Sequence, residues 1–200
     1  MHAVHSPHDE LRDMQPGDHL CCLYDTEKER RQLVHAFLEQ GLRKNHKVLC
    51  IVDDGGRDES LQHLRDSAFH FESFLNRGQL EFLTAGEAYL QKGTFDVETM
   101  MELLHRETDR AVEGEYEALR VAGKMNWALE KAESPRRLVE YEAELRSFFS
   151  SNPVLALCQY DRSKFSAELL LEILQTHPKV AIGKTIYDNF FWVSPRQRQK

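Results

Sequence analysis

The most constraining feature of this sequence is a regular alternation of short apolar runs and longer amphipathic patterns, which begins near residue 19. The run KVLCIV at Lys47–Val52 is apolar on both faces, a pattern typical of a parallel strand buried between two layers. Between such runs, apolar residues recur at helical spacing, as Leu33, Phe37 and Leu42 do. Strands that alternate with helices predict an α/β fold, a three-layer parallel sheet with helices on both faces.

Turn and capping residues set the predicted boundaries. Thr26 and Glu29 form a capping-box pattern that starts the first long helix. Residues 84–94 are interpreted as a loop or a broken helical turn and residues 123–129 as an irregular loop. Gly41 lowers the stability of the helix that contains it. Strands are predicted at 19–24, 47–52, 79–83, 118–122, 154–160, 179–182 and 187–192, the last two as short edge strands, and helices at about 27–44, 58–67, 71–76, 95–113, 136–149 and 165–176.

A chain of 200 residues indicates one domain. We expect a flexible leader at residues 1–15, the domain at 16–193 and a polar tail at 194–200. The formal net charge of −7 argues against direct binding to nucleic acid. No apolar run approaches the roughly 20 residues of a membrane span, and the N-terminus lacks the apolar core of a signal peptide. A cytoplasmic location without membrane attachment is therefore expected.

The four cysteines, Cys21, Cys22, Cys50 and Cys158, all lie in predicted strands. Cys21 and Cys22 should point to opposite faces of their strand and so should not form a disulfide with each other. There is no CxxC pair of the kind that zinc ribbons use. We expect reduced thiols in the core of the domain.

Residues 19–54, HLCCLYDTEKERRQLVHAFLEQGLRKNHKVLCIVDD, resemble the opening of a RecA/KaiC-type ATPase, with a strand, a loop, a helix and a second strand. Such ATPases place a glycine-rich loop and a lysine around the phosphates. Here the loop Tyr24–Glu29 has no glycine and carries carboxylates that would repel a nucleotide. The strand at 118–122 also lacks the terminal aspartate that would hold magnesium. ATP hydrolysis, and enzymatic activity in general, are therefore not expected.

A second set of segments is spread over nearly the whole domain, residues 16–193. The segments are Gly17-Asp18-His19-Leu20-Cys21 with Tyr24, Gly93-Thr94-Phe95-Asp96, Leu119-Arg120-Val121-Ala122-Gly123 with Met125, Trp127 and Ala128, Glu140-Tyr141-Glu142, Cys158-Gln159-Tyr160-Asp161 with Lys164-Phe165, and His177-Pro178. In their order and spacing they resemble the MEDS family of sensory domains, from which Cys22 departs. The resemblance implies a RecA-like derivative without the phosphate loop that senses a small hydrocarbon-type or C1 compound. Members occur alone or joined to histidine kinases, anti-sigma-factor-type kinases and DNA-binding domains.

His19 and Cys21 are two residues apart on a strand, so their side chains share one face. An imidazole beside a thiol could bind a metal ion, a haem or an electrophilic carbon. Plain packing of a histidine beside a buried cysteine is the alternative. A permanent zinc site needs about four ligands, and the pattern supplies only two, so no resident cofactor is predicted.

The remaining candidate residues follow strand ends or one helix. Tyr24, Trp127 and Tyr160 with Asp161 should lie at the carboxyl edge of the sheet, where open α/β folds bind ligands. Glu142, if buried, would need a partner such as Lys124 or Arg120. Aromatic packing alone would explain the same pattern. The predicted ligand site comprises His19, Cys21, Tyr24, Trp127, Tyr141, Glu142, Cys158, Tyr160 and Asp161.

Three functions are compatible with these patterns. The first is a non-enzymatic sensor whose Tyr24 and Trp127 loops close on a small ligand and change a surface that a signalling partner recognises, such as a histidine kinase or an anti-sigma-type regulator. A homodimer is compatible with this role. The second is a degenerate nucleotide-binding module that does not hydrolyse ATP, and the third is a cysteine-based redox or haem sensor.

Overall fold

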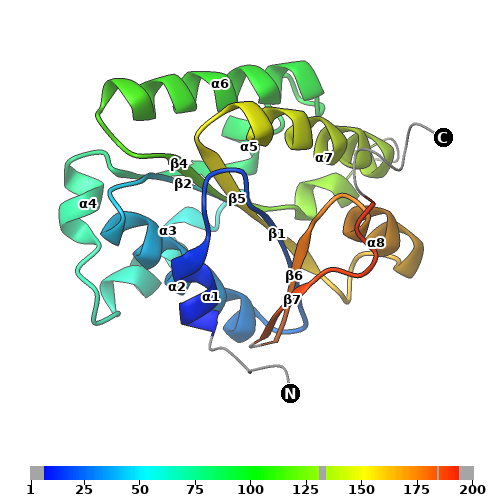
Figure 1. Cartoon of the computed structure of the whole chain (residues 1–200), viewed down its shortest axis with the longest axis horizontal. Helices are drawn as coiled ribbons and strands as arrows, with labels where there is room; N and C mark the ends of the chain where they lie inside the picture. The colour runs from blue at the N-terminus through cyan, green and yellow to red at the C-terminus, as the bar shows by residue number, and fades with distance from the viewer. Residues whose placement is uncertain (1–6, 131–133, 184, 194–200) are drawn as a thin grey trace.

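The computed structural model describes residues 7–130, 134–183 and 185–193, and its centre is a sheet of seven strands (Figure 1). The strand order is β3-β2-β4-β5-β1-β6-β7, and every neighbouring pair is parallel except β6 and β7. The predicted α/β architecture with a terminal edge hairpin is confirmed. The strands are β1 (His19–Tyr24), β2 (Lys47–Val52), β3 (Leu80–Thr84), β4 (Leu119–Lys124), β5 (Val154–Asp161), β6 (Lys179–Ile182) and β7 (Thr185–Asp188).

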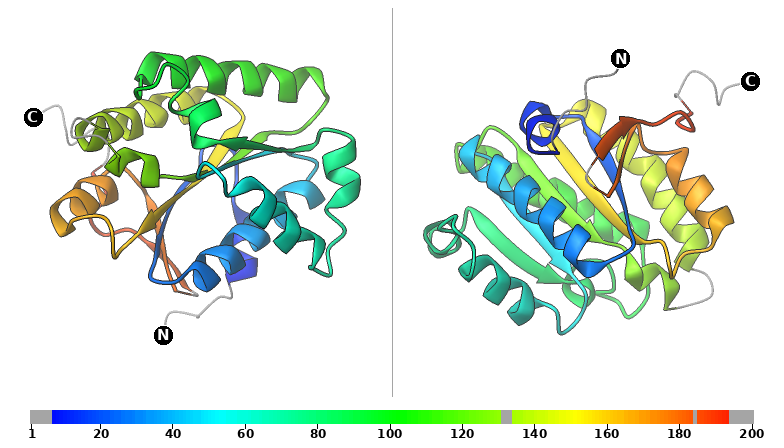
Figure 2. Two further views of the ribbon diagram at one scale, coloured as in Figure 1. Left: turned by 180° about the vertical axis from the view of Figure 1, so that it is seen from behind. Right: turned by 90° about the horizontal axis from the view of Figure 1, so that it is seen from below.

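Helices cover both faces of the sheet, and the two views of Figure 2 show the resulting three layers. One face lies against α6, α7 and α8, and the other against α1, α2 and α3. Each face has its own apolar core. The helices are α1 (Pro7–Asp13), α2 (Glu27–Arg43), α3 (Arg57–Arg65), α4 (Glu72–Asn76), α5 (Ala85–Ala88), α6 (Val97–Glu113), the 3-10 helix η1 (Asn126–Leu129), α7 (Ser134–Ser151) and α8 (Ala167–Leu174).

The two faces separate neighbouring cysteines. Cys21 packs in the core beneath α6–α8, whereas Cys22 packs in the core beneath α2. All four cysteines are buried free thiols. The sequence prediction for this strand is confirmed, because alternate side chains of an extended strand must point to opposite faces.

Three segments differ from their sequence predictions. Residues 7–13, expected in a loose leader, form α1, because the side chains of Leu11 and Met14 are buried in the core beneath α2. Strand β7 spans 185–188 instead of 187–192, because Gly183 adopts φ +60° and the hairpin turns there, placing Ile182 opposite Thr185. The segment 123–129, predicted to be an irregular loop, contains η1, whereas α5 within 84–94 agrees with the predicted broken helical turn.

One charged side chain crosses the core beneath α2. Arg120, on β4, is fully buried, donates from Nη1 to the carbonyl oxygen of Phe37 at 3.0 Å, and stacks over the Phe37 ring. It passes over Gly41 of α2, where a Cβ atom would lie 2.5 Å from Arg120 Cδ. Gly41 therefore provides the space through which Arg120 runs.

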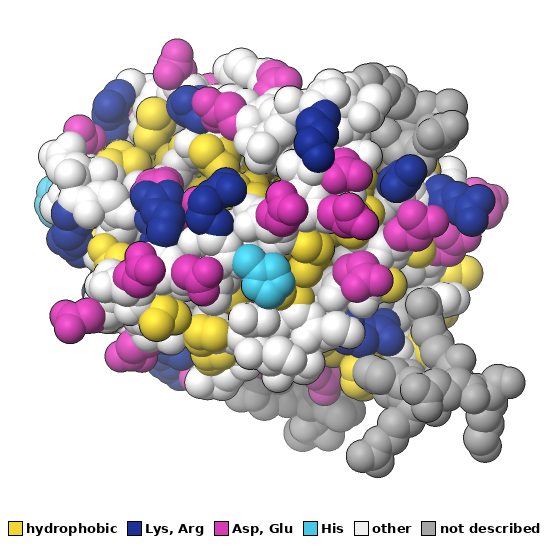
Figure 3. All heavy atoms as spheres, turned by 90° about the horizontal axis from the view of Figure 1, so that it is seen from above, with side chains coloured by type: hydrophobic (Ala, Val, Ile, Leu, Met, Phe, Trp, Pro, Cys, Tyr) yellow, Lys and Arg dark blue, Asp and Glu magenta, His cyan; other side chains and the backbone are white. Residues whose placement is uncertain are grey.

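The outer face of the α6 and α7 layer carries acidic and basic side chains interspersed with apolar ones (Figure 3). This face is not a continuous basic surface of the kind that binds nucleic acid backbones. Within the described ranges, none of the helices combines the length and the apolar composition required to span a bilayer.

Candidate functional site

A hollow of about 370 Å³ opens at the carboxyl end of β2, beside the N-termini of α2 and α3. Lys124 lies in it with Nζ 3.1 Å from Glu27 Oε1 and 2.8 Å from Asp53 Oδ2. Two arginines of this hollow also form ion pairs: Arg30 with Glu27 of α2, and Arg31 with Glu59 of α3. Its cations are therefore already engaged by carboxylates, which leaves little positive potential for a phosphate. The charged lining is Arg30, Arg31 and Lys124 with Glu27, Asp53, Asp54 and Glu59.

The segment between β1 and α2 acts as a helix cap. The Thr26 hydroxyl accepts a hydrogen bond from the Glu29 amide at 3.3 Å, and the Glu29 carboxylate accepts one from the Asp25 amide at 3.2 Å. Asp25 also pairs with Arg162. The predicted N-cap at Thr26 is confirmed, whereas the Glu29 carboxylate binds the Asp25 amide instead of the Thr26 amide that completes a capping box. These side chains occupy two amides of the segment in which a phosphate-binding loop would hold its ligand.

A buried polar cluster lies on the opposite face of the sheet, beneath α7. We call the side chains of His19, Glu142, Cys158 and His177 the His–Glu–Cys cluster. One ligand atom from each lies within 4.8 Å of the others. His19 Nε2 is 3.3 Å from Cys158 Sγ and 3.3 Å from Glu142 Oε2, and His177 Nε2 is 3.5 Å from the same oxygen. Such a concentration of polar groups in an apolar layer requires a physical explanation.

The register of the sheet brings these residues together. His19 of β1 pairs with Ala156 of β5, and Cys158 lies two residues beyond Ala156. The side chains of His19 and Cys158 therefore project from the same face of the sheet. His177 lies just before β6, on the other side of β1. The rings of His19 and His177 are in contact, with centroids 3.8 Å apart and planes tilted by 38°, and Glu142 reaches them from α7.

Hydrogen bonds fix the orientation of two members of the cluster. His177 Nδ1 is 2.9 Å from the carbonyl oxygen of Ile173, which can only accept, so the proton is on Nδ1 and Nε2 carries a lone pair. Tyr160 donates its hydroxyl to Glu142 Oε1. Glu142 Oε2 and His177 Nε2 have no hydrogen-bond partner among the described residues.

Burial determines the protonation of the cluster. It raises the pKa of Glu142 from 4.5 to about 7, against the opposing effect of the hydrogen bond from Tyr160. Burial also raises the pKa of the Cys158 thiol well above its usual value and lowers the pKa of His177 to about 4. At neutral pH both histidines and the thiol are therefore uncharged, and burial favours the protonated form of Glu142 relative to an exposed glutamate.

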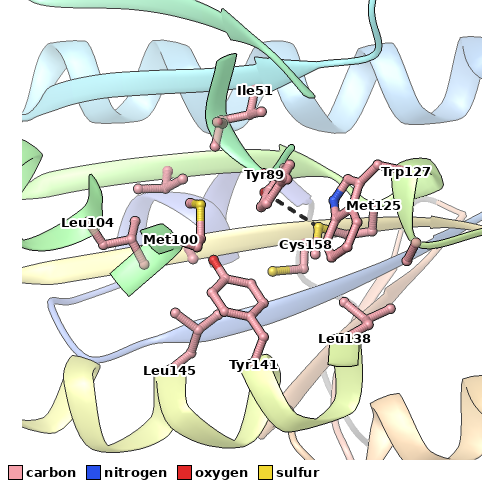
Figure 4. Packing of buried hydrophobic residues seen from close by; sticks show 14 of the residues in the cluster. Ile51, Tyr89, Met100, Leu104, Met125, Trp127, Leu138, Tyr141, Leu145 and Cys158 are labelled. Atoms are coloured by element: carbon pink, nitrogen blue, oxygen red, sulfur yellow. Dashed lines mark hydrogen bonds between the residues drawn. The ribbon is translucent and has the colours of Figure 1, made fainter. Parts of the chain in front are cut away.

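An aromatic cluster adjoins these polar groups (Figure 4). Tyr89 stacks on Trp127 with ring centroids 4.7 Å apart, and Phe95 lies 4.2 Å from Trp127 and 5.5 Å from Tyr141. All four rings are buried, and Cys158 projects from β5 beside Trp127. In the described part of the chain, the indole Nε1 of Trp127 has no hydrogen-bond acceptor.

The structure brings together most of the predicted ligand residues but not all of them. Tyr24 lies in the core beneath α2, on the face opposite Trp127, so the two do not flank one pocket. Asp161 caps the turn that follows β5 by accepting from the Ser163 amide at 3.0 Å. Those on the α7 face are His19, Cys21, Trp127, Tyr141, Glu142, Cys158 and Tyr160.

Two features of the site differ from the sequence interpretation. Glu142 contacts Tyr160, His19 and His177 instead of Lys124 or Arg120. The physical reason is topological, because Arg120 points to the other face and Lys124 to the hollow. In the sequence, His177 was identified only as part of the family resemblance, although a histidine directly before a strand that neighbours β1 could have indicated a third donor.

Comparisons with known proteins identify the relatives of this chain. Residues 18–178 match the family described as the methanogen/methylotroph, DcmR sensory domain, or MEDS. The transcriptional repressor DcmR of Methylorubrum extorquens (strain DSM 6343 / CIP 106787 / DM4) is 27% identical over 166 residues, which are 82% of this chain and 60% of the repressor. This chain therefore spans about three fifths of that relative.

A solved structure supports the predicted frame. The KaiC-like protein of the hyperthermophilic archaeon Pyrococcus horikoshii OT3 superposes with a TM-score of 0.58 at 15% identity, over 82% of this chain and 70% of that one. The RecA/KaiC-like fold is thus confirmed, and at this level of identity the likeness concerns the fold alone.

Proposed function

The chain belongs to the MEDS family of sensory domains, and we propose that it is a non-enzymatic sensor of a small hydrocarbon-type or C1 compound. The ligand would bind against the aromatic cluster of Tyr89, Phe95, Trp127 and Tyr141. A regulatory role follows from the family and from the relationship to a repressor. The ligand class and its site are the new elements of the proposal.

The observation that carries the proposal is the buried Trp127 indole N–H, which lacks an acceptor among the described residues. Leaving such a donor unsatisfied costs about 1–3 kcal/mol, so a ligand that supplies an acceptor would recover that free energy. The surrounding rings, together with Met100 and Met125, form an apolar and polarisable lining. A small molecule with an apolar body and one hydrogen-bond acceptor matches this environment.

The segment from Thr84 to Phe95 covers the aromatic cluster. It contributes two of the four rings, Tyr89 and Phe95, while residues 91–94 between them are exposed. The segment is tied down at its start, where Gly86 donates its amide to Asp54 Oδ1 at 2.9 Å. A ligand would enter by displacing this short segment instead of opening the sheet.

Helix α7 is the element best placed to transmit binding to a partner. It carries Tyr141, which contacts the rings of Tyr89 and Phe95, and the adjacent Glu142, which anchors the polar cluster. Side chains on its other face, including Arg136, Glu140 and Glu144, are exposed. A shift of α7 would therefore alter a charged surface that a histidine kinase, an anti-sigma-type regulator or a second copy could recognise.

The other two functions have weaker physical support. A nucleotide would meet the carboxylates that engage Lys124 in the hollow. A thiol switch needs thiolate, and burial raises the pKa of Cys22 and of Cys50 to about 12 and that of the other two cysteines well above the usual value.

A thermal-shift experiment on the full chain tests the proposal with dichloromethane, methanol and short alcohols, and with magnesium ATP as the competing ligand. At 100 times its Kd, a specific ligand stabilises the folded state by about 2.7 kcal/mol. For a chain of this size that corresponds to roughly 5–10 °C in Tm. The shift should disappear in Trp127→Phe and persist in Trp192→Phe, a variant of the partly exposed tryptophan.

Two outcomes would contradict the proposal. One is a set of small compounds that leaves Tm unchanged while magnesium ATP raises it, which would favour a nucleotide-binding module. The other is a ligand shift of equal size in the wild type and in Trp127→Phe, which would place binding away from the aromatic cluster.

A further inference from the structure

The geometry of the His–Glu–Cys cluster resembles a metal site. Tetrahedral coordination at about 2.0–2.3 Å places neighbouring ligand atoms about 3.3–3.7 Å apart. Three separations within the cluster are 3.3 Å for His19 Nε2 to Cys158 Sγ, 3.3 Å for His19 Nε2 to Glu142 Oε2, and 3.5 Å for His177 Nε2 to Glu142 Oε2. All four atoms lie within 4.8 Å of one another. Three edges of the tetrahedron are thus already close to their coordinated lengths.

Two atoms of the cluster make no hydrogen bond in the described residues. Glu142 Oε2 and His177 Nε2 are buried and without a hydrogen-bond partner in the described residues, and they face each other. Two acceptors at this distance repel each other unless a proton or a cation lies between them. Each is held in place, Glu142 by the Tyr160 hydroxyl and His177 by the carbonyl oxygen of Ile173. Metal-binding histidines are usually oriented by such a hydrogen bond from the other ring nitrogen.

Charge balance favours a divalent ion. A carboxylate and a thiolate neutralise a doubly charged cation, so the bound cluster would carry no net charge into the apolar layer. The donor set combines two imidazole nitrogens with one sulfur and one oxygen. This mixture suits first-row ions of intermediate softness, whereas calcium and magnesium prefer oxygen ligands alone.

We propose that His19, Glu142, Cys158 and His177 form a site for one divalent first-row transition metal ion, with zinc as the best-matched ion. Binding forms four metal–ligand bonds and breaks the S–H bond of Cys158, whose proton passes to solvent together with any proton on Glu142. The site does not depend on the small-ligand function proposed above.

Cobalt is a direct probe of this site, because a thiolate bound to Co²⁺ produces a near-ultraviolet charge-transfer band and four-coordination intensifies the visible bands. Metal-free full-length chain titrated with Co²⁺ should bind one ion and show both features, and Zn²⁺ should displace it. Cys158→Ser should abolish the charge-transfer band. Cys22→Ser should retain it, since Cys22 is equally buried but lies on the opposite face of β1.

Two further measurements avoid dependence on one variant. His177→Gln should weaken Co²⁺ binding by roughly 100-fold or more, because losing a ligand should cost at least as much as losing a residue that orients one. In the wild type, Zn²⁺ should slow alkylation of Cys158 and leave the rate for Cys22 unchanged, as read by mass spectrometry of the labelled peptides.

The proposal is overturned if Co²⁺ gives only the weak visible bands of six-coordination, which the N-terminal histidines His2, His5 and His8 could produce. It is also overturned if the charge-transfer band survives in Cys158→Ser or is lost in Cys22→Ser. Equal alkylation of Cys158 with and without Zn²⁺ would have the same meaning.

Discussion

Replacing Gly41 by alanine should destabilise the protein, although alanine is the better helix former. Gly41 lies in the last turn of α2, where a Gly→Ala change on an open helix surface gains up to about 1 kcal/mol. Here the new Cβ would lie 2.5 Å from Arg120 Cδ, 2.9 Å from Arg120 Nε and 3.1 Å from Val48 Cγ2. Arg120 has little freedom to move, because its guanidinium is held by the carbonyl oxygen and the ring of Phe37.

The balance of these two effects gives the expected magnitude. Forcing extra carbon into a packed core costs about 1–3 kcal/mol. Set against the gain in helix propensity, Gly41→Ala should lower the free energy of unfolding by roughly 1–2 kcal/mol. In an Arg120→Ala background the obstructing side chain is absent, so the same change should stabilise the protein by up to about 1 kcal/mol.

A double-mutant cycle measured by urea unfolding checks this reversal of sign. The coupling between Gly41 and Arg120 should be about 2 kcal/mol, well above the error of additivity for independent sites. If Gly41→Ala stabilises the wild type, or has the same effect in both backgrounds, the packing argument for Arg120 is refuted.

Three further predictions concern the interior. Tyr160→Phe should cost about 1–3 kcal/mol in urea unfolding, because Glu142 loses its donor, whereas Tyr187→Phe at an exposed ring should be neutral. Burial lowers the pKa of His46 to about 4, so folding keeps it neutral, and stability present above pH 6.5 should fall by up to about 3 kcal/mol as the pH drops toward 4. In His46→Gln, urea unfolding at a series of pH values should show a smaller decrease in the free energy of unfolding over this pH range. Gly123→Ala should place a Cβ 2.4 Å from the Tyr89 hydroxyl, disturb the stacking on Trp127, and increase acrylamide quenching of that tryptophan in a Trp192→Phe background.

The frame of the fold is predictable because its determinants are local. Hydrophobic periodicity located β1, β2 and β5 to within a residue, and the cap at Thr26 was readable from residue types alone. The leader helix α1 was missed because its burial depends on Leu11 meeting α2, a contact between distant segments. Gly41 was interpreted as a cost for the same reason, since the sequence does not reveal that Arg120 passes over it.

The site was only partly predictable because its members come from four separate elements. The face shared by His19 and Cys21 follows from strand geometry, yet the residues beside His19 are Cys158 and Glu142. That pairing depends on strand order, which places β5 next to β1, and no local pattern specifies strand order. His177 joins only because β6 lies on the other side of β1.

The distribution of charge is consistent with the sensing function proposed above for this RecA-like frame. At the carboxyl edge, Lys124 is neutralised by Glu27 and Asp53, so the position that open α/β sheets reserve for ligands is filled by internal ion pairs. Beneath α7, Trp127 Nε1 and Glu142 Oε2 are two of the buried polar atoms that lack a hydrogen-bond partner among the described residues. Tyr141 touches the aromatic cluster and its neighbour Glu142 touches the polar one, so both clusters bear on the same turn of α7. Under the two proposals above, a displacement of that turn would change both clusters, and any coupling between their occupancies would be reciprocal.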